Sequence, residues 1–161
     1  MTTNDILFMR EALVEAATAG AAGEIPIGAV IVRDGEIIAR AHNTNRGKKN
    51  PVCHAETLAI MEACRVTDNE RLGGCSLYVT KEPCAMCAGA IIHSRIEKVF
   101  IAAKDIKYGA CGTVFPILGN SGFNHVPEIQ FGLLEEEAEK MLKDFFAELR
   151  NGKKTTGRAS L

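Results

Sequence analysis

The stretch SLYVTKEPCAMCAGAIIHSRIEKVFIA, residues 76–102, decides the fold of this chain. Its first five residues form a short, mostly apolar run that is typical of a buried strand, and Pro83 then stands where helices commonly begin. Residues 84–94 have helical spacing, and residues 98–102 again read as a strand. A strand, a helix and a second strand in this order favour an α/β sheet with some parallel pairing.

The segments on either side extend this α/β pattern. We expect helices at residues 5–18, 54–66 and 135–150, and further strands at 27–33, 36–41 and 128–131. Asp34-Gly35 joins two of these strands and predicts a hairpin, which makes the sheet mixed. The glycine-rich residues 103–127 are too long for a passive connection in a compact domain.

The size and composition of the chain predict one globular domain. Its 161 residues are 47% hydrophobic and 24% charged, enough for one substantial core and too few for two ordinary domains. We expect this domain at residues 1–152, followed by a basic tail at 153–161. The net charge of −1 gives no overall positive field of the kind that indicates nucleic-acid binding.

The same composition predicts a cytoplasmic protein that does not enter a membrane. The longest apolar runs, such as residues 27–32, are far too short to cross a bilayer, and the first ten residues show no secretory pattern. With a core of this size and no export pattern, we expect reduced thiols and not a disulfide framework. The six cysteines are Cys53, Cys64, Cys75, Cys84, Cys87 and Cys111.

Two short motifs carry the chemistry, His54-Ala55-Glu56 and Pro83-Cys84-Ala85-Met86-Cys87. Together they supply one imidazole, two thiolates and a carboxylate that need not bind metal. Tetrahedral Zn²⁺ accepts such nitrogen and sulfur ligands, and three protein ligands leave a fourth position for water. A histidine, a nearby glutamate and a Pro-Cys-x-x-Cys segment form the known signature of zinc-dependent nucleobase deaminases.

The spacing within the motifs predicts where a metal ion would lie. Cys84 and Cys87 are three residues apart and share a helix face, whereas His54 and Glu56, two apart, would diverge in the middle of a helix. Both can approach one ion only if it lies over the first helical turn. We therefore predict Zn²⁺ between two helix N-termini, where exposed amides favour thiolate, with Glu56 as the catalytic proton carrier.

Other interpretations of these residues stay open. Cys53, Cys84 and Cys87 could form a structural zinc site, although Glu56 would then have no purpose. A Cys-x-x-Cys pair can also be redox-active, but such pairs usually follow an early strand, and this pair comes in the middle of the chain. A glutamate in a first helical turn is favourable for the helix dipole alone.

In these motifs and in the stretches around them, the chain resembles bacterial tRNA-specific adenosine deaminases of the cytidine-deaminase superfamily. The resemblance extends from the first helix to about residue 150. The stretches that carry it are GEIPIGA (23–29), AHN (41–43), HAE (54–56), YVTKEPCAMCAGA (78–90), IHSRI (92–96), FNH (123–125) and DFFAELR (144–150).

The resemblance implies a three-layer α/β/α, cytidine-deaminase-like fold with a five-stranded mixed sheet, a homodimer and one Zn²⁺ per chain. The implied reaction is hydrolytic conversion of the wobble adenosine of a tRNA anticodon stem-loop to inosine. Asn43 would hydrogen-bond the flipped nucleotide, and Ile27 and Ala55 would line the base pocket. Asp105 would lie beside the neighbouring anticodon nucleotides, and Phe145 or Phe146 would help to hold the loop.

These implied contacts have structural alternatives. Asn43 can close a turn, Ile27 can pack in a strand core, and one of two adjacent phenylalanines can face inward. Residues 105–109 and 114–118 also differ from the family pattern, in a region that should border the nucleic acid.

Two other functions remain in view. One is deamination of a free base or nucleoside, with guanine the most plausible substrate and cytosine the next. In that case Tyr108 and Phe115 would close over a small ring and exclude RNA. The other is a zinc-stabilised RNA-binding or dimerisation module without catalysis.

Overall fold

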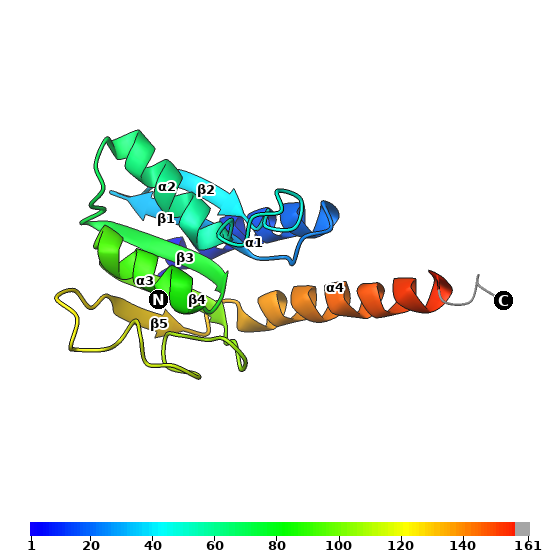
Figure 1. The fold of residues 1–161 in the computed structure, drawn as a ribbon. Helices are drawn as coiled ribbons and strands as arrows, with labels where there is room; N and C mark the ends of the chain where they lie inside the picture. The colour runs from blue at the N-terminus through cyan, green and yellow to red at the C-terminus, as the bar shows by residue number, and fades with distance from the viewer. Residues whose placement is uncertain (157–161) are drawn as a thin grey trace.

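The computed structural model describes the backbone of residues 1–156 and the side chains of residues 1–152. Helices and strands follow one another along the chain as Figure 1 shows. Their bounds are α1 (Thr3–Ala21), β1 (Gly28–Arg33), β2 (Glu36–His42), α2 (Ala55–Thr67), β3 (Cys75–Lys81), α3 (Ala85–Ser94), β4 (Lys98–Ala103), β5 (Glu128–Phe131) and α4 (Glu135–Thr156).

The five strands form one mixed sheet in the order β2-β1-β3-β4-β5. Strand β1 is antiparallel to both β2 and β3, whereas β3, β4 and β5 run parallel. Asp34 and Gly35 both have positive φ, at 52° and 79°, as a tight hairpin turn with the twist of the strands requires. The predicted five-stranded mixed sheet and its hairpin are confirmed.

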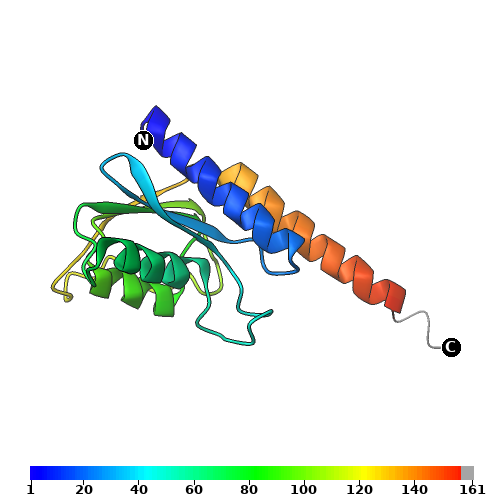
Figure 2. The ribbon, with the colours of Figure 1, turned by 90° about the horizontal axis from the view of Figure 1, so that it is seen from above.

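Helices cover both faces of this sheet, which confirms the predicted three layers. Figure 2 shows α1 and α4 side by side on one face and α2 and α3 on the other. Successive residues of a strand point to opposite faces, so each strand supplies both cores. Ile31, Leu77 and Ile101 pack in the core under α2 and α3, and their neighbours Val30, Tyr78 and Phe100 pack under α1 and α4.

Small residues bring α1 very close to the sheet. Ala12, Ala16 and Ala19 are fully buried along α1. A Cβ atom on Gly28 would collide with the carbonyl oxygen of Ala12 and the amide nitrogen of Ala16. The amide of Gly28 also donates to the buried hydroxyl of Thr80 at 3.1 Å. Glycine is therefore required at this position by space.

Helix ends differ from the expected positions. Helix α1 begins at a capping box between Thr2 and Asp5 and continues through Gly20 to Ala21. Helix α4 runs to Thr156 and not to residue 150, so it includes the first part of the expected tail. The rest of that tail, residues 157–161, lies outside the described residues. In the described part of the chain, the helices are too short or too polar to cross a membrane.

We predict that Gly28→Ala lowers the free energy of unfolding by about 1–3 kcal/mol, because α1 must move to admit the added methyl group. Denaturant unfolding measures the change. Gly73→Ala is the matched control, since Gly73 has open space around its Cβ position, and its stability should stay within about 0.5 kcal/mol of the parent. Equal stability of the two variants would contradict the tight packing.

Candidate metal centre

Three side chains with metal-binding atoms meet at the N-termini of α2 and α3. His54 is the N-cap residue of α2, Cys84 is the N-cap residue of α3, and Cys87 lies in the first turn of α3. Neither N-cap side chain makes the usual capping hydrogen bond to its own helix. The structure thus brings the predicted ligands to the predicted place, with their donor atoms free to face one another.

The distances among the three donor atoms suit tetrahedral zinc. His54 Nδ1 lies 3.8 Å from Cys84 Sγ and 3.6 Å from Cys87 Sγ, and the two sulfur atoms are 3.7 Å apart. Zinc–sulfur bonds of about 2.3 Å and zinc–nitrogen bonds of about 2.0 Å imply separations of about 3.8 Å between sulfurs and about 3.5 Å from nitrogen to sulfur. The three residues therefore fit the ion.

The two thiols need a cation between them if both are to ionise. Hydrogen bonds from Cys87 and His54, the former the larger effect, lower the pKa of Cys84 to about 4. The pKa of Cys87 is raised instead, first by its hydrogen bond with Cys84 and then by burial. A divalent cation relieves this conflict, because metal-bound thiols are deprotonated.

Glu56 lies beside this cluster without belonging to it. Its carboxylate is only 4% exposed, in the first turn of α2. Burial raises its pKa to about 7, and the negative charge of Cys84 acts in the same direction. Among the described residues, the group that could hold a metal consists of His54, Cys84 and Cys87. A carboxyl group with such a pKa can both accept and donate a proton near neutral pH.

Cys53 is buried directly before His54, but its thiol is not part of the group that could hold a metal. The alternative structural site of Cys53, Cys84 and Cys87 is therefore not the set that the described structure assembles. All six cysteines are free thiols, as expected.

Asn43, Ala55 and Ile27 form a chain of contacts that leads to the cluster. The amide of Ala55 donates to Asn43 Oδ1 at 2.9 Å, and the amide of Asn43 donates to the carbonyl of Ile27 at 3.1 Å. Asn43 is 3% exposed. Its side-chain carbonyl thus holds the start of α2, while its NH₂ group has no hydrogen-bond partner among the described residues. Ile27 is half-buried against the core.

Asp105 lies at the same edge of the sheet as Cys84. It follows β4, whose last residue, Ala103, pairs with Lys81 at the end of the parallel strand β3. The Asp105 carboxylate forms an ion pair with Lys81 at 2.7 Å and accepts the amides of Lys107 and Tyr108. Burial alone would raise the pKa of Asp105, but these donors hold it below its usual value.

Phe145 and Phe146 lie on α4, away from the cluster. Their rings meet edge to face with centroids 5.5 Å apart, Phe145 half-buried and Phe146 38% exposed. Helix α4 projects past the sheet on the side where α2 and α3 begin (Figures 1 and 2). A partner that contacts both the metal centre and α4 therefore has to extend from one face of the sheet to the other.

Two buried carboxylates outside the two metal-binding motifs hold the irregular segments beside the cluster. Glu24 accepts the amides of Arg46 and Gly47 at 3.1 and 2.6 Å. Glu82 accepts backbone amides from the segment that follows β4. The sequence signal for Glu82 was an acidic residue directly before Pro83, between a buried strand and a buried helix.

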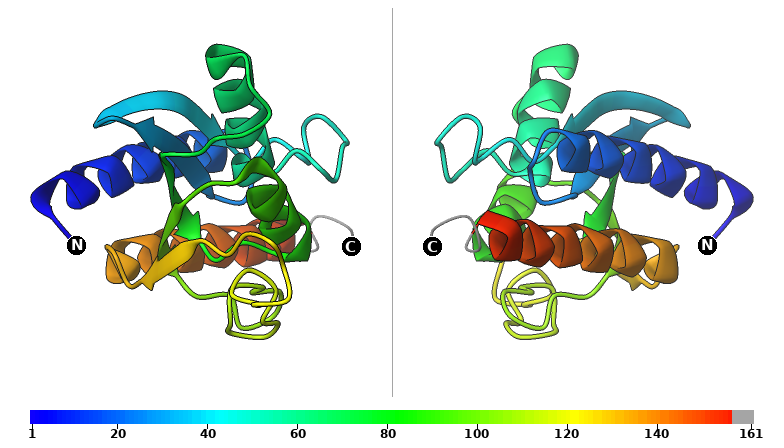
Figure 3. Two further views of the ribbon diagram at one scale, coloured as in Figure 1. Left: turned by 90° about the vertical axis from the view of Figure 1, so that its left-hand side faces the viewer. Right: turned by 90° about the vertical axis from the view of Figure 1, so that its right-hand side faces the viewer.

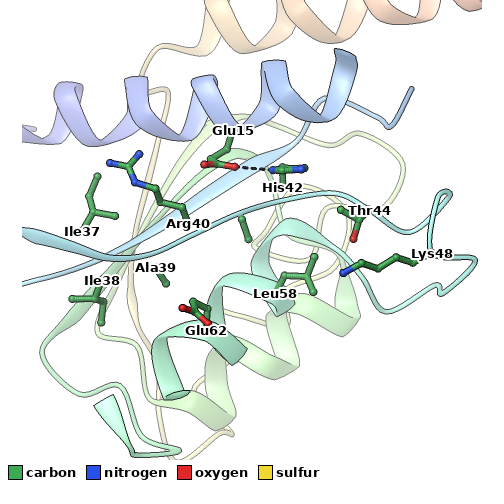
Figure 4. Close-up of a pocket in the computed structure, with 11 residues that line it drawn as sticks. Glu15, Ile37, Ile38, Ala39, Arg40, His42, Thr44, Lys48, Leu58 and Glu62 are labelled. Atoms are coloured by element: carbon green, nitrogen blue, oxygen red, sulfur yellow. Dashed lines mark hydrogen bonds and ion pairs between the residues drawn. The ribbon is translucent and has the colours of Figure 1, made fainter. Parts of the chain in front are cut away.

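A separate groove of about 530 Å³ follows β2 between α1 and α2 (Figure 4). His42 lies in it and pairs with Glu15 at 2.7 Å. His42, at the end of β2, is thus held against α1. None of the three cluster residues lines this groove.

Comparison with known proteins gives a consistent result. Residues 2–103 match the family described as the cytidine and deoxycytidylate deaminase zinc-binding region. The tRNA-specific adenosine deaminase of Bacillus subtilis (strain 168) is 52% identical over 152 residues, 94% of this chain and 94% of the relative.

Solved structures of deaminases are also similar to this chain. One from studies of A-to-I editing by tRNA:A34 deaminases at the wobble position is 43% identical, with a TM-score of 0.82, covering 84% of this chain and 99% of that one. The guanine deaminase from Nitrosomonas europaea is 26% identical, with a TM-score of 0.77, covering 88% and 84%. The cytidine-deaminase-like fold is confirmed.

We predict that Cys84→Ala and Cys87→Ala each lose zinc, because two remaining protein ligands hold the ion far less tightly than three. Cys53→Ala is the matched control and should keep one zinc per chain. Elemental analysis of the purified variants measures this. Loss of zinc from Cys53→Ala, or its full retention in Cys84→Ala, would contradict the ligand set.

Proposed function

Because the chain belongs to the tRNA-specific adenosine deaminases, within the family of zinc-binding cytidine and deoxycytidylate deaminases, we propose that it converts the wobble adenosine of a tRNA anticodon to inosine. The observation that carries the proposal is the tetrahedrally spaced cluster with a buried glutamate beside it, in a chain so similar to its relatives. The net reaction replaces the adenine amino group with a carbonyl oxygen from water and releases ammonia.

His54, Cys84 and Cys87 hold Zn²⁺ in this proposal. When bound, the ion supplies the Lewis acidity that activates water for attack on the base. Glu56 accepts the first proton that the attacking water loses and donates it to the ring nitrogen. It then accepts the second proton from the hydroxyl group formed on the base carbon and donates it to the amine, which leaves as ammonia while the carbonyl forms. Burial favours the protonated form of this carboxyl group, so that it can return a proton as well as accept one.

The base pocket in this proposal is built by Ile27, Asn43 and Ala55. The support is that Asn43 keeps a free NH₂ group while its carbonyl is held by Ala55. Asp105 would act on the neighbouring nucleotides from the same edge of the sheet as Cys84, and Phe145 or Phe146 would contact the loop from the projecting part of α4. An anticodon loop presents unpaired bases, so extrusion of one base costs only a few kcal/mol.

Local charge and not net charge would hold the RNA phosphates. The loop between β2 and α2 projects from the body (Figure 3) and carries the exposed cations Arg46, Lys48 and Lys49.

The free cysteines and the tRNA substrate support a cytoplasmic protein.

We further propose a homodimer. Several large apolar side chains are exposed on α2, on α3 and in the segment that follows β4, and contact with a second copy of the chain would remove them from water. They are Met61, Met86, Ile106, Tyr108, Phe115, Phe123 and Val126.

A second candidate function is deamination of a free base. The similarity to a guanine deaminase supports it, and so do the exposed Tyr108 and Phe115, which could close over a small ring. Guanine deaminases rank second because the Nitrosomonas structure has lower identity, 26% over 88% of this chain, and the Bacillus subtilis structure has lower coverage, 42% over 65% with a TM-score of 0.60. The tRNA:A34 deaminase structure is 43% identical over 84% of this chain with a TM-score of 0.82.

For the homodimer, we predict that light scattering after gel filtration gives twice the chain mass of 17.4 kDa at micromolar concentration. A monomer mass across that range would contradict the dimer.

For the substrate, we predict inosine formation in an anticodon stem-loop with adenosine at the wobble position, measured by chromatography of the digested RNA. Ammonia release from guanine, cytosine and free adenosine should be far slower. Turnover of a free base without any inosine in the hairpin would replace the leading function with the second.

For Glu56, we predict that Glu56→Gln lowers kcat by about 100- to 10,000-fold, because the variant cannot carry a proton. Zinc content and RNA affinity should stay unchanged. A non-enzymatic module would lose nothing measurable in this variant, so unchanged behaviour in every assay would contradict catalysis.

A further inference from the structure

Glu82 is a buried acidic residue that the proposed chemistry does not use. It stands two residues before Cys84 and is only 3% exposed. Oε2 accepts the amide of Asp105 at 3.0 Å, and Oε1 accepts the amides of Cys111 and Thr113 at 3.0 and 3.2 Å. Both oxygens of one carboxylate therefore bind three backbone groups of the segment 105–113.

A glycine confirms how closely this segment approaches the carboxylate. A Cβ atom on Gly109 would collide with Glu82 Oε2 and with the carbonyl oxygen of Asp105. That carbonyl in turn accepts the amide of Gly109 at 3.0 Å, and the carbonyl of Pro83 accepts the amide of Ala110 at 2.9 Å. The segment is thus fastened to the two residues directly before Cys84.

The fastened segment presents polar and aromatic groups outward. Asp105 forms an ion pair with Lys81 at the start of the segment. Tyr108 in the segment is 66% exposed, and Phe115, two residues after it, is 47% exposed. Without Glu82, the buried amides of Asp105 and Cys111 would lose their acceptors, which is costly, and the half-buried bond from Thr113 would be lost as well. The segment would then be held against the Cys84 turn mainly by the bond from Ala110 to Pro83.

We propose that Glu82 is a positioning residue for substrate recognition: its carboxylate fixes the segment 105–113 against the Cys84 turn, so that Asp105 and its neighbours meet the nucleotides beside the target base. This inference rests on the proposed function. It assigns to Glu82 an effect on RNA binding that is separable from metal binding and from proton transfer.

Replacement of Glu82 by glutamine distinguishes the hydrogen bonds made by the two carboxylate oxygens. In Glu82→Gln, one oxygen becomes an NH₂ group, which cannot accept a hydrogen bond. The side chain keeps more bonds if its remaining oxygen faces Cys111 and Thr113. The amide of Asp105 then faces a donor and is released.

The first experiment measures amide hydrogen exchange and kinetics of Glu82→Gln in the full-length zinc protein. We expect exchange at Asp105 to become about tenfold faster or more, with smaller changes at Cys111 and Thr113. We expect KM for the anticodon hairpin to rise about tenfold, kcat to change less than about threefold, and zinc to remain at one per chain. The control is Glu97→Gln, whose carboxylate accepts the amide of Gly74 at the far end of β3 at 2.9 Å, and its kinetics should equal the parent's.

The second variant, Gly109→Ala, keeps the charge of Glu82 and displaces the segment by steric contact. It should raise KM for the hairpin in the same direction, with zinc retained. Parent-like exchange at Asp105 in Glu82→Gln, parent-like KM in both variants, or loss of zinc together with kcat would overturn the positioning role. Exchange at Asp105 needs no substrate, so failure of the hairpin as a substrate for the parent would count against the proposed function and leave this contact independently measured.

Discussion

The metal centre depends on helices α2 and α3 beginning beside each other at one edge of the sheet. Each N-cap position carries a donor atom that makes no capping bond to its own helix. The donor atoms therefore face one another at the spacing of a tetrahedral ion. The exposed helix amides and the cation both favour the thiolate form of cysteine. Without them, two thiols this close together would not both lose their protons.

Around this centre, buried carboxylates accept the backbone hydrogen bonds that would be made within helices and strands in regular secondary structure. Glu24 holds the loop before α2, and Glu82 holds the segment after β4. Hydrogen bonds from backbone amides to a charged acceptor are stronger than those to a neutral one, so irregular backbone can be held in one position. The segments that border the centre can thus vary in sequence at exposed positions such as Tyr108 while their backbone stays fixed.

Much of the fold follows from local patterns that need no tertiary information. Alternation of apolar residues and the Asp34-Gly35 turn were enough to predict the strands, because strand period and turn conformation are properties of a few adjacent residues. The ends of the helices were harder to predict from the sequence. The first helix was expected at residues 5–18, but α1 continues to Ala21, and Ala16 and Ala19 are fully buried along it. Helix α4 continues to Thr156 although its local signals weakened near residue 150.

The sequence alone determined the candidate donors and the mixed α/β class, since His54, Cys84, Cys87 and Glu56 lie in motifs whose chemistry is readable residue by residue. The exclusion of Cys53 from the donor set needed the structure. Only the tertiary structure decided the distances among them and the partners of the buried acids. Glu82 meets Cys111 across 29 positions of the chain, and no local pattern can specify which distant amides a buried carboxylate will bind. Long-range hydrogen bonding of this kind is set by how the layers pack.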